Sequence, residues 1–156
     1  MIFKTESKFQ KTLVEQALDQ GIRLIVINKV FDLELKSKTR SRFIELKIIQ
    51  HDLDKIPNVG DKYGFKFTKN QTRVVKRTKN KARLPFVIAH DNKTKSKKSF
   101  YFITGEKLEK ASHYGYRNEY PYFIFNRVER NHIFKKPITW EKVLQELKTL
   151  SEYCTA

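Results

Sequence analysis

Two neighbouring segments of this chain alternate in polarity with the two-residue period of a β-strand. They are VFDLELK, residues 30–36, and RFIELKII, residues 42–49. The intervening SKTR, residues 37–40, consists of small and polar residues that suit a hairpin turn. A hairpin closed by this turn is expected to place Asp32 directly opposite Glu45 in the neighbouring strand.

This pairing brings charges together inside a sheet. Two like charges in directly opposed positions destabilise a sheet. Because side chains alternate along a strand, Glu45 and Lys47 share one face, whereas Leu46 points to the other. Two carboxylates, from Asp32 and Glu45, and one ammonium group are therefore expected at one place.

Two interpretations of this cluster stay open at this point. A divalent cation such as Mg²⁺ would offset the repulsion, because hard cations bind carboxylate oxygens. Alternatively, the charges form the solvated outer face of an antiparallel sheet, with Lys47 neutralising one acid. A shift of one residue in the register would also move the set to opposite faces.

The first segment predicts an amphipathic helix over residues 5–20, which Gly21 ends. On a helical wheel, Glu6 falls on the apolar face that Phe9 and Leu13 define. Its carboxylate either interacts with the positive end of the helix dipole or is a third acid directed at the sheet.

The remaining pattern predicts an α+β or α/β fold, in one domain over residues 1–156, with a mixed central sheet between helices. A loop is expected at 51–64, and a tyrosine-rich loop, HYGYRNEYPYF, begins at His113. The other expected elements are a strand at 23–28, a helix at 69–82 capped by Thr68, a strand at 85–91, a hairpin turn at 92–98, a strand at 99–104, a helical turn at 105–111, a strand at 120–128, and a helix from Trp140 to about Tyr153 capped by Thr139.

The formal net charge of +16 points to a polyanion as partner, with nucleic acid as the leading class. No acidic residue occurs between Asp61 and Asp91, where basic residues crowd together. They are Lys69, Arg73, Lys76, Arg77, Lys79, Lys81 and Arg83. A compositional bias toward lysine is the alternative explanation of the charge.

Several classes of protein do not fit the sequence. No apolar run approaches the roughly 20 residues of a membrane span, and the N-terminus lacks the pattern of a secretory signal. Cys154 is the one cysteine, which excludes an internal disulfide framework. We therefore expect a cytoplasmic protein with no membrane partner, of prokaryotic, viral or plasmid origin.

The ordered set of Glu6, Asp32 in VFDLEL, and Glu45-Leu46-Lys47 in FIELK resembles the PD-(D/E)xK nucleases, which have the restriction-endonuclease-like fold. The order of helix, strand, Asp-bearing strand and ExK strand is similar to the core of that family. The resemblance covers roughly residues 5–90, within an expected core of about 5–128. Phe31 stands where the nominal family pattern has proline.

The resemblance implies a metal-dependent active site. Asp32, Glu45 and the backbone carbonyl of Leu46 would hold one or two Mg²⁺ ions, with Mn²⁺ as a substitute. Lys47 would orient or activate the attacking water, and Glu6 would bind a second metal or a water attached to it.

The resemblance also points to Gln71, because a glutamine on a helix after the ExK strand leans toward the site in several branches of the fold. A solvated glutamine in the first turn of a helix is the alternative. Residues expected to contact DNA phosphates are Lys69, Arg73, Lys76, Arg77 and Arg83. The tyrosine-rich segment either stacks on bases or packs at a sheet edge.

The function expected from this resemblance is that of an Mg²⁺-dependent DNA endonuclease, structure-selective in the manner of a Holliday-junction resolvase. A site-specific homing or restriction endonuclease and a non-catalytic nucleic-acid-binding protein are the alternatives. A homo-oligomer, dimer or tetramer, is expected, because cutting two strands requires two active sites.

Overall fold

The computed structural model describes residues 2–36, 41–49, 62–66, 71, 73–74, 77–79, 84–105, 107, 113–117, 120–126 and 134–153. Its centre is a five-stranded mixed sheet with the strand order β1-β2-β3-β5-β6. The strands are β1 (Leu24–Val26), β2 (Leu33–Leu35), β3 (Arg42–Ile49), β5 (Phe86–Asp91) and β6 (Phe100–Ile103). β3 and β5 run parallel, and the other neighbouring pairs in this sheet are antiparallel.

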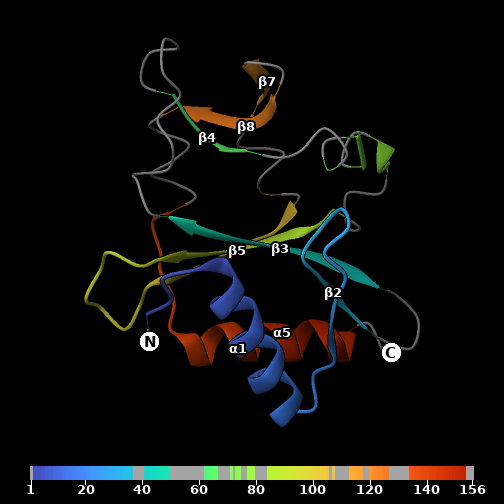
Figure 1. The fold of residues 1–156 in the computed structure, drawn as a ribbon, viewed down its shortest axis with the longest axis vertical. Helices are drawn as coiled ribbons and strands as arrows, with labels where there is room; N and C mark the ends of the chain where they lie inside the picture. The colour runs from blue at the N-terminus through green and yellow to red at the C-terminus, as the bar shows by residue number, and fades with distance from the viewer. Residues whose placement is uncertain are drawn as a thin grey trace.

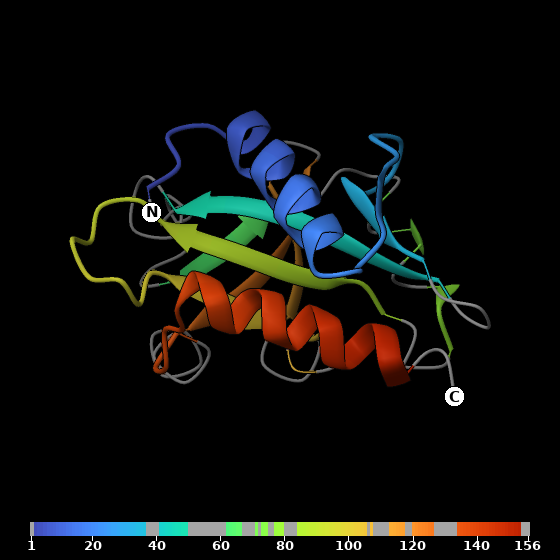
Figure 2. The same ribbon diagram turned by 90° about the horizontal axis from the view of Figure 1, so that it is seen from below.

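Helices α1 (Glu6–Asp19) and α5 (Trp140–Tyr153) cover the same face of this sheet (Figures 1 and 2). Each begins at a threonine whose hydroxyl accepts a hydrogen bond from a first-turn amide, Thr5 from Lys8 and Thr139 from Lys142. α1 is followed by Gly21, whose positive φ of 76° suits the turn into β1.

The main hydrophobic core lies between these helices and the sheet. Phe9 and Leu13 of α1 are fully buried against it, as are Val143 and Leu147 of α5. The apolar stripe of each helix therefore faces the sheet, as helical periodicity requires.

The opposite face of the sheet carries a second apolar cluster. It is built on Phe31, Leu84, Val87, Ala89 and Ile103. Val74, a helical residue, packs against this cluster. Both long helices thus lie on one face of the sheet, and not on its two sides as expected; on the other face, Val74 is the helical residue that the structure describes in contact with the second cluster.

A second, three-stranded sheet lies on the side of the large sheet away from α1 and α5 (Figure 1). Its strands are β4 (Lys62–Lys66), β7 (His113–Arg117) and β8 (Tyr120–Asn126), in the order β4-β8-β7. Both neighbouring pairs are antiparallel.

The structure confirms several elements expected from the sequence. The strand at residues 42–49 and the helix from Trp140 to Tyr153 have the expected bounds. β2 and β3 pair with Leu33 opposite Ile44 and Leu35 opposite Arg42, the expected register. The coarse α+β class is therefore correct.

Other expectations were wrong. Residues 62–64, expected in a loop, belong to β4, and the first part of the tyrosine-rich loop is strand β7. Each of these strands contains a glycine, Gly64 or Gly115, and glycine is depleted in strands, so the sequence pattern concealed them. The expected turn at 37–40 and Thr68 lie outside the described residues.

Within the described residues, no helix has the length and apolar character needed to cross a membrane.

Loss of the cap of α5 should destabilise the fold. Thr139→Ala removes the acceptor of the Lys142 amide and should lower the free energy of unfolding by about 1 kcal/mol, measured by urea denaturation. Thr149→Ala, at an exposed position near the end of the same helix, is the matched control and should leave stability unchanged or slightly raise it, because alanine favours helix more than threonine does. Equal losses in the two variants would contradict the capping role.

Candidate active site

The turn between β1 and β2 positions Asp32. The backbone amides of Ile27 and Asn28 both donate to the carbonyl oxygen of Asp32, at 3.1 and 3.4 Å. Asn28 has a φ of 45°, in the left-handed region that asparagine tolerates better than most residues. These contacts fix the backbone of Asp32 at the point where the chain enters β2.

The side chain of Asp32 is attached to β3. Its Oδ2 accepts a hydrogen bond of 2.8 Å from the backbone amide of Leu46. The register of β2 and β3, continued by one residue, places Asp32 opposite Glu45, and the two carboxyl groups share a hydrogen bond. The two expected acids are therefore in direct contact.

Glu45 is 4% exposed, so its carboxyl group is almost completely removed from water. Burial, together with the hydrogen bond and the charge of Asp32, raises the pKa of Glu45 to about 9, against the lowering effects of Lys47 and Gln71. Near neutral pH this raised pKa favours a proton on the Glu45 carboxyl, which then donates a hydrogen bond to Asp32. A single proton between two carboxyl groups offsets the repulsion expected from the sequence.

Gln71 joins three segments of the site. Its Nε2 donates to the carbonyl oxygen of Val30 at 2.6 Å and also to Oε2 of Glu45. The side chain is 6% exposed, so the alternative of a solvated glutamine is wrong. Gln71 thereby connects the helical residues after β4, the turn that carries Asp32, and β3.

Glu6 interacts with the same group of charges from the first turn of α1. Glu6 as a whole is exposed, yet loss of hydration around its carboxyl group is the largest effect and raises its pKa. The charge of Asp32 raises this pKa as well, and the charge of Lys47 lowers it. Lys47 is thus close enough to influence both Glu6 and Glu45.

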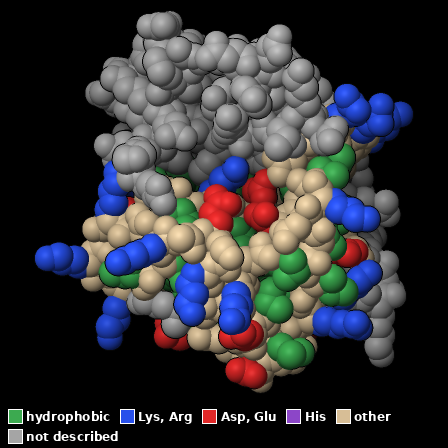
Figure 3. All heavy atoms as spheres, viewed as in Figure 1, with side chains coloured by type: hydrophobic (Ala, Val, Ile, Leu, Met, Phe, Trp, Pro, Cys, Tyr) green, Lys and Arg blue, Asp and Glu red, His purple; other side chains and the backbone are tan. Residues whose placement is uncertain are grey.

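The acids do not form a three-residue metal site in the part of the chain that the structure describes. No three His, Cys, Asp or Glu side chains are grouped there so that they could hold one metal ion. The carboxyl groups of Asp32 and Glu45 share a hydrogen bond, and the backbone of Leu46 lies beside Asp32. Near the centre of Figure 3, Asp or Glu side chains border a hollow, and a Lys or Arg side chain lies beside them.

This pair fits a hard divalent cation in its chemistry. Mg²⁺ prefers oxygen ligands such as those of two carboxyl groups. The Glu45 carboxyl favours its protonated form because Lys47 and Gln71 do not outweigh its burial and the neighbouring Asp32. A bound cation would replace that proton, so its affinity should rise with pH.

Two of the residues expected to contact DNA can be placed. Arg73 and Arg77 are exposed and helical, in the segment from which Val74 packs on the sheet. Lys69, Lys76 and Arg83 lie outside the described residues, as do the side chains of the tyrosine-rich segment.

Sequence reasoning missed the contribution of the β1–β2 turn. The backbone amide of Asn28 holds Asp32, and the backbone carbonyl of Val30 holds Gln71. Side-chain patterns in a sequence do not reveal contacts to the backbone. The one available signal was Asn28, since asparagine is enriched at left-handed turn positions.

The raised pKa of Glu45 predicts a pH-dependent stability. Between the unfolded value of 4.5 and the folded value of about 9, the folded protein holds an extra proton, so its stability falls as pH rises through this window. Glu45→Gln has no such proton to lose. In EDTA at pH 8, the free energy of unfolding of the Glu45→Gln variant should exceed that of the parent by on the order of 3 kcal/mol. At pH 5 the two free energies of unfolding should be similar.

Urea denaturation at the two pH values measures this difference. Glu15→Gln removes the same charge from an exposed position of α1 and is the matched control, with no comparable pH-dependent gain. A Glu45→Gln variant that is less stable than the parent at pH 8 would show that the carboxyl group is not buried as described.

No protein-family model matches the chain, and a search of the curated proteins finds no match.

Proposed function

We propose that this protein is a metal-dependent DNA endonuclease that hydrolyses phosphodiester bonds, with a site related to the PD-(D/E)xK arrangement. The observation that carries the proposal is the direct contact between Asp32 and the buried Glu45, with Lys47 within electrostatic reach. Burying an acid beside a second acid costs stability, and sites that persist at such a cost are often functional. The order α1, β1, β2, β3 supports the same assignment.

Asp32 and Glu45, with the backbone carbonyl of Leu46, would hold the cation. When bound, Mg²⁺ acts as a Lewis acid toward the phosphate and its attacking water. The oxygen of that water forms a bond to phosphorus, and the bond from phosphorus to one sugar oxygen breaks. The products are a phosphate monoester and a free hydroxyl, so no covalent intermediate with the protein is required.

The other residues prepare this reaction. Lys47 orients the water and offsets the negative charge that develops on the phosphate. Gln71 holds Glu45 in place against the turn that carries Asp32. Glu6 faces the same charges from α1 and would contact a second cation or a water beside it.

The proposed substrate is DNA, because the net charge of +16 and the exposed Arg73 and Arg77 favour contact with phosphates. We favour a structure-selective enzyme acting on branched DNA such as a four-way junction, working as a dimer or tetramer. A site-specific homing or restriction enzyme is the variant of the same proposal.

A second candidate function is a nucleic-acid-binding protein without catalysis. Two observations favour it: the described residues contain no three-ligand metal group, and Glu45 keeps its proton near neutral pH. Such a protein would bind DNA through its basic residues and leave the carboxyl pair hydrogen-bonded.

A cleavage assay separates the two functions. Supercoiled plasmid and a synthetic four-way junction should be cut in Mg²⁺ and left intact in EDTA. Lys47→Met, which keeps the length of the side chain, should reduce the cleavage rate by roughly 10² to 10⁴, the usual contribution of a group that positions or activates water.

Asp32→Asn should also abolish measurable cleavage, whereas Glu15→Gln on the exposed side of α1 should retain it. Binding of the junction in EDTA should survive in all three variants. Junction binding by the parent protein without any cleavage in Mg²⁺ or Mn²⁺ would instead establish the non-catalytic alternative.

The exposed arginines should affect binding and not the metal site. Arg77→Ala removes one phosphate contact and should lower the slope of log affinity against log salt by about 1, measured by fluorescence anisotropy in EDTA. Arg23→Ala, a matched change at another exposed position, should leave the slope unchanged. Identical slopes for parent and Arg77→Ala would remove this helical segment from the interface.

A further inference from the structure

The turn that joins β5 to β6 is strongly basic. Residues 92–98, NKTKSKK, contain four lysines and no acid. All four lysine side chains, at positions 93, 95, 97 and 98, are exposed. This lysine hairpin plays no part in the site described above.

The charges of the lysine hairpin are not neutralised within the described part of the chain. Lys36 and Lys142 form ion pairs there, with Glu34 and Glu146. None of the four hairpin ammonium groups has an ion pair or a hydrogen bond with a described residue. Four like charges in seven residues repel one another, and an external polyanion would relieve that repulsion.

The backbone of the lysine hairpin is held in a defined shape. The amide of Asp91 donates to the carbonyl oxygen of Ser99 at 2.8 Å, which extends the pairing of β5 with β6. Within the turn, the Lys93 amide donates to Oδ1 of Asp91 at 3.0 Å, and the Lys98 amide donates to Oγ of Ser96 at 3.1 Å. A preformed turn presents its lysines with little backbone entropy left to lose on binding.

The lysine hairpin follows directly from the strand beside the active site. In the parallel pairing of β3 with β5, Lys47 lies opposite Ala89. The turn starts at Asn92, about 10 Å further along the strand direction at about 3.3 Å per residue. Figure 1 shows it projecting beyond the end of the sheet, and Lys or Arg side chains extend from that edge in Figure 3.

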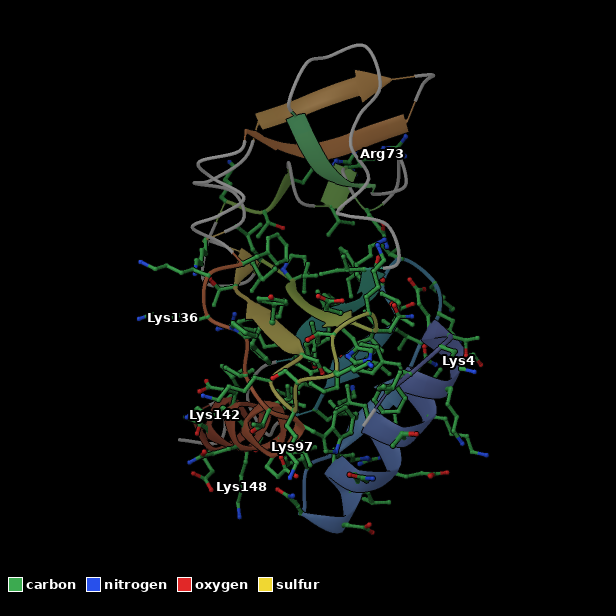
Figure 4. The ribbon with its side chains drawn as sticks, turned by 90° about the vertical axis from the view of Figure 1, so that its left-hand side faces the viewer. Lys4, Arg73, Lys97, Lys136, Lys142 and Lys148 are labelled. Carbon is green, nitrogen blue, oxygen red and sulfur yellow. The ribbon has the colours of Figure 1, made fainter. Side chains whose placement is uncertain are left out.

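The lysine hairpin is separate from the helical arginines. In Figure 4, Arg73 lies toward the three-stranded sheet, whereas Lys97 lies toward the end of the molecule occupied by α1 and α5. The two basic groups therefore lie toward different ends of the molecule.

We infer that the lysine hairpin is a second phosphate-binding surface, which grips the DNA backbone to one side of the cleavage site. This inference rests on the proposed function, which supplies DNA as the partner. The turn starts about 10 Å along β5 from the position opposite Lys47, a length of about three base pairs at about 3.4 Å each. Lysines act there as point charges, so the contact adds affinity without reading sequence.

The test replaces all four lysines together, as Lys93→Gln, Lys95→Gln, Lys97→Gln and Lys98→Gln, in the full chain. Binding of a fluorescent four-way junction and of a linear duplex in EDTA should weaken about tenfold or more near 100 mM salt. The slope of log affinity against log salt should fall by about 2 to 4, since each phosphate contact contributes about 0.9. Cleavage in Mg²⁺ should show a raised KM with kcat within about twofold of the parent.

A matched control neutralises four exposed lysines of α1 and α5, with Lys8→Gln, Lys11→Gln, Lys142→Gln and Lys148→Gln. Both sets lower the formal net charge by four, from +16 to +12. A larger loss of affinity and salt slope in the hairpin variant supports the inference, and equal effects in the two variants overturn it.

The outcomes also separate this inference from the proposed function. If the parent protein cleaves DNA but both variants bind alike, the lysine hairpin is no interface and the nuclease proposal stands. If the parent never cleaves but the hairpin variant alone loses affinity, the surface stands and the nuclease proposal falls. A parent protein that binds no DNA overturns both.

Discussion

The antiparallel pairing of β2 with β3 is the constraint on which the candidate site depends. Its register sets Asp32 opposite Glu45, and the hydrogen bond from the Leu46 amide to Asp32 continues the pairing beyond the end of β2. A side-chain oxygen thus takes the place that a backbone carbonyl would hold in a longer strand. The carboxyl group of Asp32 is fixed by the same interactions that build the sheet, so the geometry of the site and the stability of the fold are linked.

The same pairing puts an acid where water cannot reach it. Glu45 lies on the sheet face opposite to α1 and α5, next to Val87 in the parallel strand. Without a cation, the shared proton and Gln71 are what make this burial tolerable. In the proposed function, both carboxyl groups are in place before a cation binds, and the cost of that preorganisation is borne by the folded protein.

The parallel pairing of β3 with β5 links the site to the rest of the surface. β3 carries Glu45 and Lys47, and its neighbour β5 leads directly into the lysine hairpin. The buried His90 of β5 accepts a hydrogen bond from the Phe3 amide. This bond attaches the N-terminal segment to β5. β5, which pairs with the strand of the candidate site, therefore also holds the N-terminal segment and leads into the lysine hairpin.

The sequence by itself determined the local elements and the pairing of Asp32 with Glu45, because strand alternation and helix capping depend on residues close together in the chain. It did not reveal strands β4 and β7, whose glycines break the usual pattern. Only the tertiary structure decided that Gln71 is buried against Glu45 and that Glu6, Asp32 and Glu45 do not form one three-acid group. Those outcomes depend on the packing of segments distant in sequence, where burial and hydration are set by neighbours that no local pattern specifies.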